Sequence, residues 1–368
     1  MDKWALVLGG GGAKGAYHLG VWQALSEMSI KVDFISGTSI GAINGAMLCQ
    51  GSYEDLKKLW SEITIDRVVD LKGSDITGES LFDIKNIKEV AERAINKSGF
   101  EMTPLKQLLI EYVDEEKLRN SECGFALVTC KLTDLEEVPL KKEDIPNGRV
   151  VDYLMASASL PGLKPAEIDG VQFIDGGVKN NIPIDIPMSL GYKNIILVDV
   201  GGAQIIKNKS TSGLNVYEVR ASKNLIGMME FKSEAIKKTI KLGYFDCYKA
   251  FARLEGKIYN FNIGDYKKIR LKYSEKILDG LEYAAEILGI EQFKVYKVES
   301  FIDGVLKKFE YERKNNDRGE MVSQLVRLVD DILLDKKETI AEKIIAGFSG
   351  EIKKGAGAIA YFLKDKNS

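Results

Sequence analysis

FISGTSIGAING, the sequence of residues 34–45, joins two elements through a serine. Val32–Ser36 is a short apolar run that predicts a buried strand, and Ile40–Gln50 carries small and apolar residues that predict a helix packed closely on it. The Gly-x-Ser-x-Gly pattern at residues 37–41 also occurs by chance in glycine-rich turns, but here it has the strand-to-helix context that a nucleophile requires. The hydroxyl would lie at a helix N-terminus, which favours developing negative charge, so Ser39 is a candidate nucleophile.

A glycine loop precedes this stretch. Trp4–Leu8 is an apolar run that predicts a first buried parallel strand, GGGGAKG follows at residues 9–15, and helical spacing then predicts a helix from about Lys14 to Ser29. Backbone N–H groups of such a loop are uncrowded and point toward a helix N-terminus. The sequence therefore predicts an anion-binding turn.

The glycine loop has three possible interpretations. A phosphate-binding P-loop requires Gly-Lys-Ser/Thr, and here Ala16 follows the last glycine. A dinucleotide fingerprint matches at residues 10–15, but its acidic partner, Asp33, would lie at the beginning of the second strand instead of at its end. The third interpretation is an oxyanion hole for an intermediate on Ser39, and it is favoured because the two loops would share one crevice.

Composition narrows the class of protein. The chain has 368 residues, 45% of them hydrophobic and 29% charged, with a formal net charge of -2, so nothing global indicates a nucleic-acid partner. Four cysteines without a C-x-x-C pair, together with a single histidine, do not make a zinc site. We expect free thiols, no metal and no cofactor. No secretory signal is visible, so a cytoplasmic protein is expected.

Two later strands are each predicted to end at an aspartate. Strands are predicted at Phe125–Cys130, with Glu137–Leu140 pairing beside it, and then at residues 171–174, which deliver Asp175 into a glycine turn. A further buried strand ends near Asp199. An aspartate in a glycine turn is often only a turn residue that binds its own backbone, and Asp175 taken alone is open to that interpretation.

A serine nucleophile needs a proton acceptor. His18 is the single histidine, and it precedes Ser39 inside a predicted helix, an order that none of the common Ser-His-Asp triads has. We therefore interpret His18 as a packing or helix-surface residue, which leaves a carboxylate as the direct base. Asp175 is preferred to Asp199 because its glycine turn would allow a close approach to another backbone.

With these residues in place, the chain resembles the patatin-like phospholipases, lipid acyl hydrolases with a Ser–Asp dyad. Three blocks carry the resemblance, and the run Ala156–Pro165 is similar to a fourth. The blocks comprise Gly10, Gly11, Gly12, Ala13, Lys14 and Gly15; Gly37, Thr38, Ser39, Ile40 and Gly41; and Asp175, Gly176 and Gly177. The resemblance spans residues 4 to about 200, and the ordered set is far more specific than any one block.

The resemblance implies a fold and a mechanism. The implied fold class is α/β, a three-layer α/β/α patatin-like fold with a mostly parallel central sheet. The implied reaction is metal-independent hydrolysis of a lipid ester. Asp175 would accept the proton of Ser39, the N–H groups of Gly10, Gly11 and Gly12, with that of Ile40, would stabilise the oxyanion, and water would release the acyl-enzyme.

The rest of the chain is predicted to be largely helical. We expect a catalytic domain at residues 1–262, with a helical insertion at about 53–113 that forms either a lid or a plain packing layer, and a helical C-terminal region at 263–368. Residues 336–368 are basic and amphipathic, which is typical of a peripheral membrane contact or, more simply, of a helix packed on a core.

Two other functions stay open at this level. One is a nucleotide-binding module that uses the loop from Gly10 to Gly15. The other is a hydrolase effector that stays inactive until a ligand or partner arrives. The expected partner is a lipid or phospholipid substrate, and the sequence does not indicate the head group, the acyl position or the oligomeric state.

Overall fold

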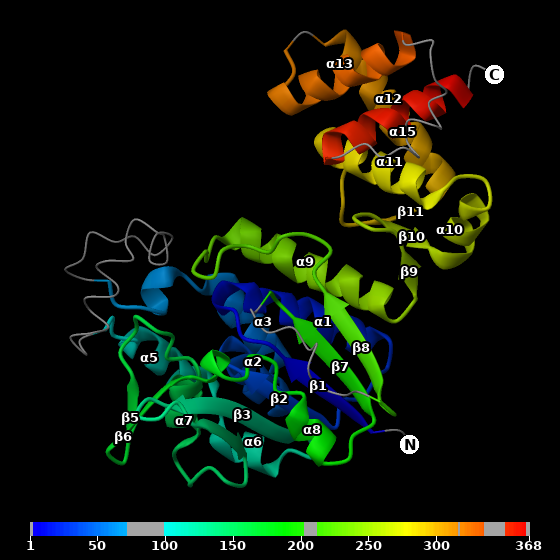
Figure 1. The fold of residues 1–368 in the computed structure, drawn as a ribbon. Coiled ribbons are helices and arrows are strands. Elements are labelled where there is room, and N and C mark those ends of the chain that lie inside the picture. The colour runs from blue at the N-terminus through cyan, green and yellow to red at the C-terminus, as the bar shows by residue number, and fades with distance from the viewer. Residues whose placement is uncertain (1–2, 72–98, 202–211, 316, 335–349, 366–368) are drawn as a thin grey trace. The chain divides into compact units, whose positions relative to one another are not determined.

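The chain forms two compact units, Met1–Ala250 and Phe251–Ser368, in a computed structural model (Figure 1). The predicted border after residue 262 falls inside the second unit, at the end of a short strand. The structure describes residues 3–71, 99–201, 212–315, 317–334 and 350–365.

An eight-stranded sheet forms the centre of the first unit. Its strand order is β5-β6-β3-β2-β1-β7-β8, and β4 also pairs with β3. The strands are β1 (Trp4–Leu8), β2 (Phe34–Thr38), β3 (Gly124–Lys131), β4 (Glu137–Lys141), β5 (Ala166–Ile168), β6 (Val171–Asp175), β7 (Asn194–Asp199) and β8 (Asn215–Arg220). Strands β3, β2, β1, β7 and β8 are mutually parallel, while β4, β6 and β5 run antiparallel to their neighbours. The mostly parallel sheet is therefore confirmed.

Helices surround the sheet in this unit. The α-helices are α1 (Ala16–Glu27), α2 (Ile40–Cys49), α3 (Tyr53–Glu62), α5 (Thr103–Tyr112), α6 (Glu115–Asn120), α7 (Val150–Ser157), α8 (Asp185–Ser189) and α9 (Ser233–Ala250). The 3-10 turns among the described residues of this unit are η1 (Gly12–Gly15), η2 (Ile65–Arg67) and η5 (Gly176–Val178). The predicted helix over 14–29 is thus η1 followed by α1.

Alternation along β1 and β2 assigns these helices to two layers. Side chains of successive strand residues point to opposite faces of a sheet. Phe34 packs in one buried cluster with Ile186 of α8. Its neighbour Ile35 lies on the other face, 2.9 Å from the position that a Cβ on Gly45 of α2 would take. Figure 1 shows α8 and α2 on opposite sides of the strands. The three-layer α/β/α fold is confirmed.

Most predicted strands lie within one or two residues of the observed ones. β1 has the predicted bounds, while β2 begins and ends two residues later than predicted. That difference matters, because β2 continues to Thr38 and leaves Ser39 as the only residue between strand and helix.

The predicted insertion over 53–113 is described only in part. α3 and α5 are helical as expected, and α5 packs beside α7. Residues 72–98, which would form the body of a lid, lie outside the described residues. The lid therefore stays a prediction.

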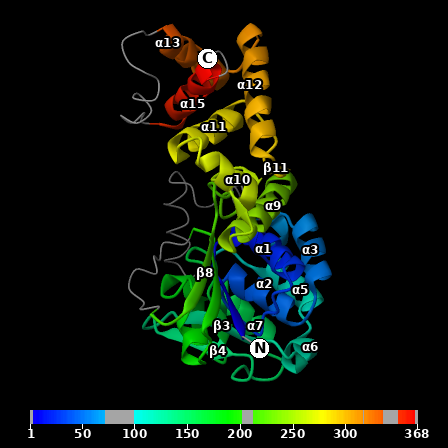
Figure 2. The ribbon, with the colours of Figure 1, turned by 90° about the vertical axis from the view of Figure 1, so that its right-hand side faces the viewer.

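The second unit has a hydrophobic core of its own. Its elements are β9 (Leu254–Glu255), β10 (Asn260–Asn262), α10 (Ile263–Arg270), α11 (Glu275–Ile287), β11 (Val295–Tyr296), α12 (Val298–Lys314), α13 (Glu320–Leu334) and α15 (Glu351–Asp365). α11 and α15 lie side by side (Figure 2), and a Cβ on Gly280 would lie 2.5 Å from the Lys354 carbonyl oxygen. The predicted helical character is confirmed, and a small sheet of β11, β10 and β9 accompanies it.

The structure describes only some of the apolar side chains of the amphipathic C-terminal segment. Ile359 and Phe362 of α15 are buried in the core of the second unit, as expected for a packed helix. Ile344, Ile345 and Phe348 lie outside the described residues. Among the described residues, no helix combines the length and the apolar character that crossing a membrane requires.

Candidate active site

Ser39 occupies a strained turn between β2 and α2. Its backbone has φ 57° and ψ -126°, a region that non-glycine residues seldom adopt and that tends to mark functional positions. Both flanking glycines are required by space. A Cβ on Gly37 would lie 2.3 Å from the Gly41 carbonyl oxygen, and a Cβ on Gly41 would lie 2.2 Å from that of Leu8. The sharp turn is thus built from close backbone crossings, as the motif predicts.

Strand β3 brings Asp175 to Ser39. The register pairs Thr38 of β2 with Val128, and it pairs Asp175 of β6 with Thr129, the next residue of β3. Ser39 follows Thr38, so the end of β2 and the end of β6 meet at the same level of β3. Two residues that are 136 positions apart in the sequence therefore become neighbours.

The carboxyl group of Asp175 is almost completely buried. The residue is 1% exposed, and its Oδ1 accepts a hydrogen bond of 2.6 Å from the Gly177 N–H. Oδ2 has no partner with standard hydrogen-bond geometry among the described residues. Burial raises the pKa of Asp175 to about 6, while the nearby Ser39 hydroxyl and the Gly177 N–H oppose that rise. A carboxyl tuned in this way is a stronger base than an exposed aspartate.

The glycine loop presents free N–H groups beside the serine. A Cβ on Gly10 would lie 3.0 Å from Ser39 Cβ, so the loop and the nucleophile are in contact. The N–H of Gly10 itself donates to the Asn181 carbonyl oxygen at 3.3 Å. The N–H groups of Gly11 and Gly12 have no acceptor within the described ranges. The geometry thus favours Gly11 and Gly12 over Gly10 as oxyanion donors.

Ile40 is the remaining predicted donor. It is the first residue of α2, where backbone N–H groups have no partner inside the helix. Its N–H has no acceptor in the described part of the chain. Gly15 lies against its side chain, since a Cβ there would be 2.5 Å from Ile40 Cγ1. This glycine therefore lets η1 and α2 approach closely.

Two serines that the sequence did not single out bind the backbone N–H groups of Ser39 and Asp175. The N–H of Ser39 donates to Ser157 Oγ at 2.9 Å, and the Ser157 hydroxyl donates to the Val128 carbonyl oxygen at 2.7 Å. The N–H of Asp175 donates to the Ser159 carbonyl oxygen at 2.8 Å. Both serines lie in the run Ala156–Pro165, whose break from small-residue helix to prolines was the available signal.

His18 is placed as a buried packing residue. It is 1% exposed, its Nδ1 lies 3.2 Å from Asn44 Nδ2, and its Nε2 has no partner in the described part of the chain. Burial lowers the pKa of His18 to about 3, so the ring is neutral. Asn44 also donates to the Gly15 carbonyl oxygen and accepts from Trp60, so this network supports α1 and α2.

The two remaining acidic candidates have other roles. Asp199 Oδ1 accepts from the Gly201 N–H, as a turn residue does. Asp33 Oδ2 accepts from the Trp4 N–H at the amino end of the parallel strands, opposite the glycine loop. Asp33 is thus far from the place where a dinucleotide-binding acid would be needed.

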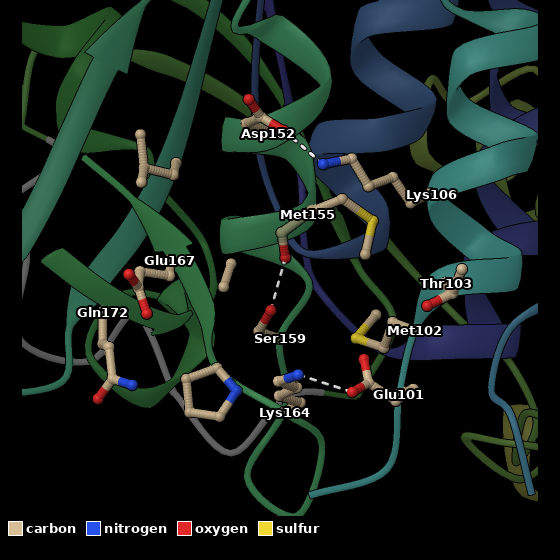
Figure 3. A pocket seen from close by; sticks show the side chains of 13 residues that line it. Glu101, Met102, Thr103, Lys106, Asp152, Met155, Ser159, Lys164, Glu167 and Gln172 are labelled. Atoms are coloured by element: carbon tan, nitrogen blue, oxygen red, sulfur yellow. Dashed lines mark hydrogen bonds and ion pairs between the residues drawn. The ribbon is translucent and has the colours of Figure 1, made fainter. Parts of the chain in front are cut away.

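A cavity of about 330 Å³ lies beside α7 (Figure 3). Met155 and Ser159, four residues apart, line it, and Met102 faces Met155 across it. Its rim carries two ion pairs, Lys106–Asp152 at 2.8 Å and Lys164–Glu101 at 2.7 Å. Ser157, whose hydroxyl contacts Ser39, does not line this cavity. Neither Ser39 nor Asp175 lines the cavity, although Ser159, which does, accepts the Asp175 N–H.

No cluster of three or more histidine, cysteine, aspartate or glutamate side chains suited to a metal ion occurs within the described ranges. The four cysteines are free thiols. Ser39 and Asp175 themselves offer a hydroxyl group and a buried carboxyl group, with backbone N–H donors beside them.

Comparison with known proteins gives consistent similarities. Residues 6–188 match the family model described as patatin-like phospholipase. The chain is 32% identical over 204 residues to patatin-like phospholipase domain-containing protein 7 of Rattus norvegicus, covering 54% of this chain and 13% of that protein. It is 32% identical over 205 residues to lysophospholipase NTE1 of Saccharomyces cerevisiae, covering 54% and 11%. The match thus spans only about an eighth of these relatives.

Among solved structures, the chain is similar to VipD from Legionella pneumophila. The TM-score is 0.46 and the sequence identity 16%, over 97% of this chain and 90% of that one.

Proposed function

Because residues 6–188 form a patatin-like phospholipase domain, we propose that this chain hydrolyses carboxylic esters of lipids through a Ser39–Asp175 dyad. The observation that carries the proposal is the juxtaposition of a strained, nearly buried serine with a buried aspartate whose pKa is raised to about 6. We propose that the enzyme is of the phospholipase A or lysophospholipase type, with a phospholipid or lysophospholipid as its substrate. This type is in keeping with the names of the relatives.

The proposed first step is acylation. Asp175 takes the proton of the Ser39 hydroxyl as Oγ attacks the ester carbonyl, and the resulting oxyanion is stabilised by the N–H groups of Gly11, Gly12 and Ile40. The leaving alcohol receives the proton from Asp175. In the second step water donates a proton to Asp175 and attacks the acyl group. The bond between the acyl carbon and Ser39 Oγ then breaks, Asp175 returns the proton to Oγ, and the fatty acid is released with Ser39 and the Asp175 carboxylate restored.

The role of Ser157 in this mechanism is to hold the nucleophile. Its hydroxyl accepts the N–H of Ser39, a residue whose strained backbone needs support from its surroundings. The Ser159 carbonyl does the same for the N–H of Asp175. Both members of the dyad are thus fixed through the end of α7, which favours a preorganised site.

The test compares four proteins in the presence of a chelator: wild type, Ser39→Ala, Asp175→Asn and His18→Ala. Substrates are p-nitrophenyl butyrate and vesicles of phosphatidylcholine with lysophosphatidylcholine. We expect Ser39→Ala and Asp175→Asn to lose at least about a thousand-fold in kcat, because removing a nucleophile or its base removes the acylation route. His18→Ala should keep activity within about ten-fold.

Thermal unfolding of every variant separates misfolding from lost chemistry, and labelling of Ser39 by a fluorophosphonate measures the active fraction of the wild type and of His18→Ala, which keep both Ser39 and Asp175. If His18→Ala folds but is inactive, His18 would be the proton acceptor in place of Asp175, and the proposed dyad would be wrong. A wild type that reacts with the label yet hydrolyses nothing would indicate a hydrolase gated by a ligand or partner.

A further inference from the structure

We propose that Asn181 is a positioning residue that fixes the oxyanion loop against the catalytic base, an inference that rests on the proposed function. Asn181 lies beyond all the motif blocks, and it is 9% exposed. Its backbone and side chain contact Gly10, and its side-chain oxygen also lies beside Gly177 in the turn that follows Asp175.

The contacts with the glycine loop are reciprocal. The Gly10 N–H donates to the Asn181 carbonyl oxygen, and Asn181 Nδ2 donates to the Gly10 carbonyl oxygen, both at 3.3 Å. A Cβ on Gly10 would lie 2.5 Å from Asn181 Oδ1, so the amide is packed directly on the loop. With its own N–H and C=O held in this way, Gly10 orients the next two peptide groups, which carry the free N–H donors of Gly11 and Gly12.

The same amide reaches the base. The position that a Gly177 Cβ would take is 2.8 Å from Asn181 Oδ1 and 2.8 Å from Asp175 Oδ1. The two oxygens are therefore close neighbours across Gly177, whose N–H donates to Asp175 Oδ1. One neutral side chain thus spans the distance between the oxyanion donors and the carboxyl that accepts the proton.

The neutrality of this amide has a chemical consequence. An aspartate has the shape of an asparagine, but it would place a second negative charge beside Asp175. Two carboxyl groups that lie this close interact strongly, and the second ionisation of the pair is pushed to higher pH. A side chain remote from the base would leave the pH dependence of the reaction unchanged when replaced by its charged isostere. A shift therefore reports that Asn181 lies beside Asp175, and the loss of rate in Asn181→Ala reports the positioning role.

The test measures the acylation rate constant from the burst of p-nitrophenol between pH 4.5 and 9. The variants are Asn181→Asp, Asn181→Ala and the control Asn194→Asp, an identical change at the amino end of β7. The acid limb is the part of the pH profile where the acylation rate constant falls as the pH decreases. In Asn181→Asp we expect this limb to move to higher pH by about one unit or more. In Asn181→Ala we expect the acylation rate on the pH plateau to fall at least about ten-fold, with KM changed less than about three-fold and the limb in place.

Active fractions come from fluorophosphonate titration, and folding is followed by thermal unfolding. Asn194→Asp should match the wild type in both limb and rate. An acid limb in Asn181→Asp at the same pH as in the wild type would overturn the proposal. So would a loss of acylation rate in Asn181→Ala that is fully explained by a smaller active fraction. A wild type no faster than Ser39→Ala would remove the proposed function itself, and this inference with it.

Discussion

At the scale of single residues, the environment of Asp175 decides how the site behaves with pH. The carboxyl is buried, and Oδ2 has no standard hydrogen-bond partner in the described part of the chain, so water does not stabilise its charge. Burial raises the pKa to about 6, above the ordinary aspartate value. The carboxyl group is therefore protonated over a range in which exposed aspartates are ionised, and two consequences can be measured.

The first consequence concerns the rate. Only ionised Asp175 can accept the proton of Ser39, so kcat/KM should fall about ten-fold for each pH unit below an apparent pKa near 6. The measurement is the pH profile of ester hydrolysis at substrate concentrations well below KM. A profile that stays flat down to pH 4.5 would contradict Asp175 as the base.

The second consequence concerns stability. Because the folded-state pKa is raised, the ionised carboxyl is disfavoured in the fold, and the penalty is present above pH 6 and vanishes below about pH 4. Asp175→Asn should therefore raise the free energy of unfolding at pH 8, by about 3 kcal/mol at most, and leave it nearly unchanged at pH 4. Urea unfolding at both pH values measures this, and equal effects at the two values would refute it.

At the scale of elements, the β2–α2 junction depends on backbone contacts that admit no side chain. A methyl group on Gly41 would overlap the Leu8 carbonyl oxygen, which belongs to the neighbouring strand β1. Gly45, one turn further along α2, would meet only the side chains of Ile35, Phe125 and Leu8. Side chains can adjust, whereas two crossing backbones cannot separate without displacing the helix from the sheet.

This contrast gives a matched pair of substitutions in one helix. Gly41→Ala should destabilise the first unit by more than about 4 kcal/mol or prevent its folding, because overpacking against backbone is not relieved by a rotamer change. Gly45→Ala should cost less than about 2 kcal/mol, since alanine also favours the helix. Chemical unfolding of both variants tests the pair, and similar losses would show that the Leu8 contact is not the cause.

At the scale of the whole molecule, each of the two units has a hydrophobic core among its described residues. The core of the second unit is formed by residues between Ile258 and Phe362, and a cluster on the sheet of the first unit is formed by residues between Ala5 and Leu197. The buried carboxylate of Glu282 accepts hydrogen bonds from the backbone N–H groups of Ile258 and Tyr259. It therefore binds the start of the second unit to α11. A unit that buries its own apolar surface and polar groups has what independent folding requires.

We therefore expect residues 251–368 to fold when expressed alone. The fragment should show a cooperative urea transition with helical circular dichroism, because its core does not draw on the first unit. The same measurement on residues 263–368, which lack β9, β10 and the three Glu282-bonded residues at 257–259, is the control and should show lower stability. A fragment 251–368 without a cooperative transition would argue against two independent units.

The amino-acid sequence by itself determined the local geometry of the site. Strand, turn and helix around Ser39 follow from hydrophobic runs and glycine spacing, and the turn that holds Asp175 follows from a strand that runs into two glycines. These features depend on neighbours a few residues apart, so short-range sterics and propensities specify them. The α/β class was implied by the family resemblance that the three motif blocks carry, and the alternation of strands and helices in the structure agrees with it.

Only the tertiary structure decided which distant groups meet. The register of β3 sets Asp175 beside Ser39, and packing brings Ser157 and Asn181 to them, although none of these pairings has a local signal. Burial, which no single stretch of sequence displays, raises the pKa of Asp175 and keeps His18 neutral. The physical reason is that long-range contacts and desolvation belong to the packed core as a whole, and they exist only once the sheet has assembled.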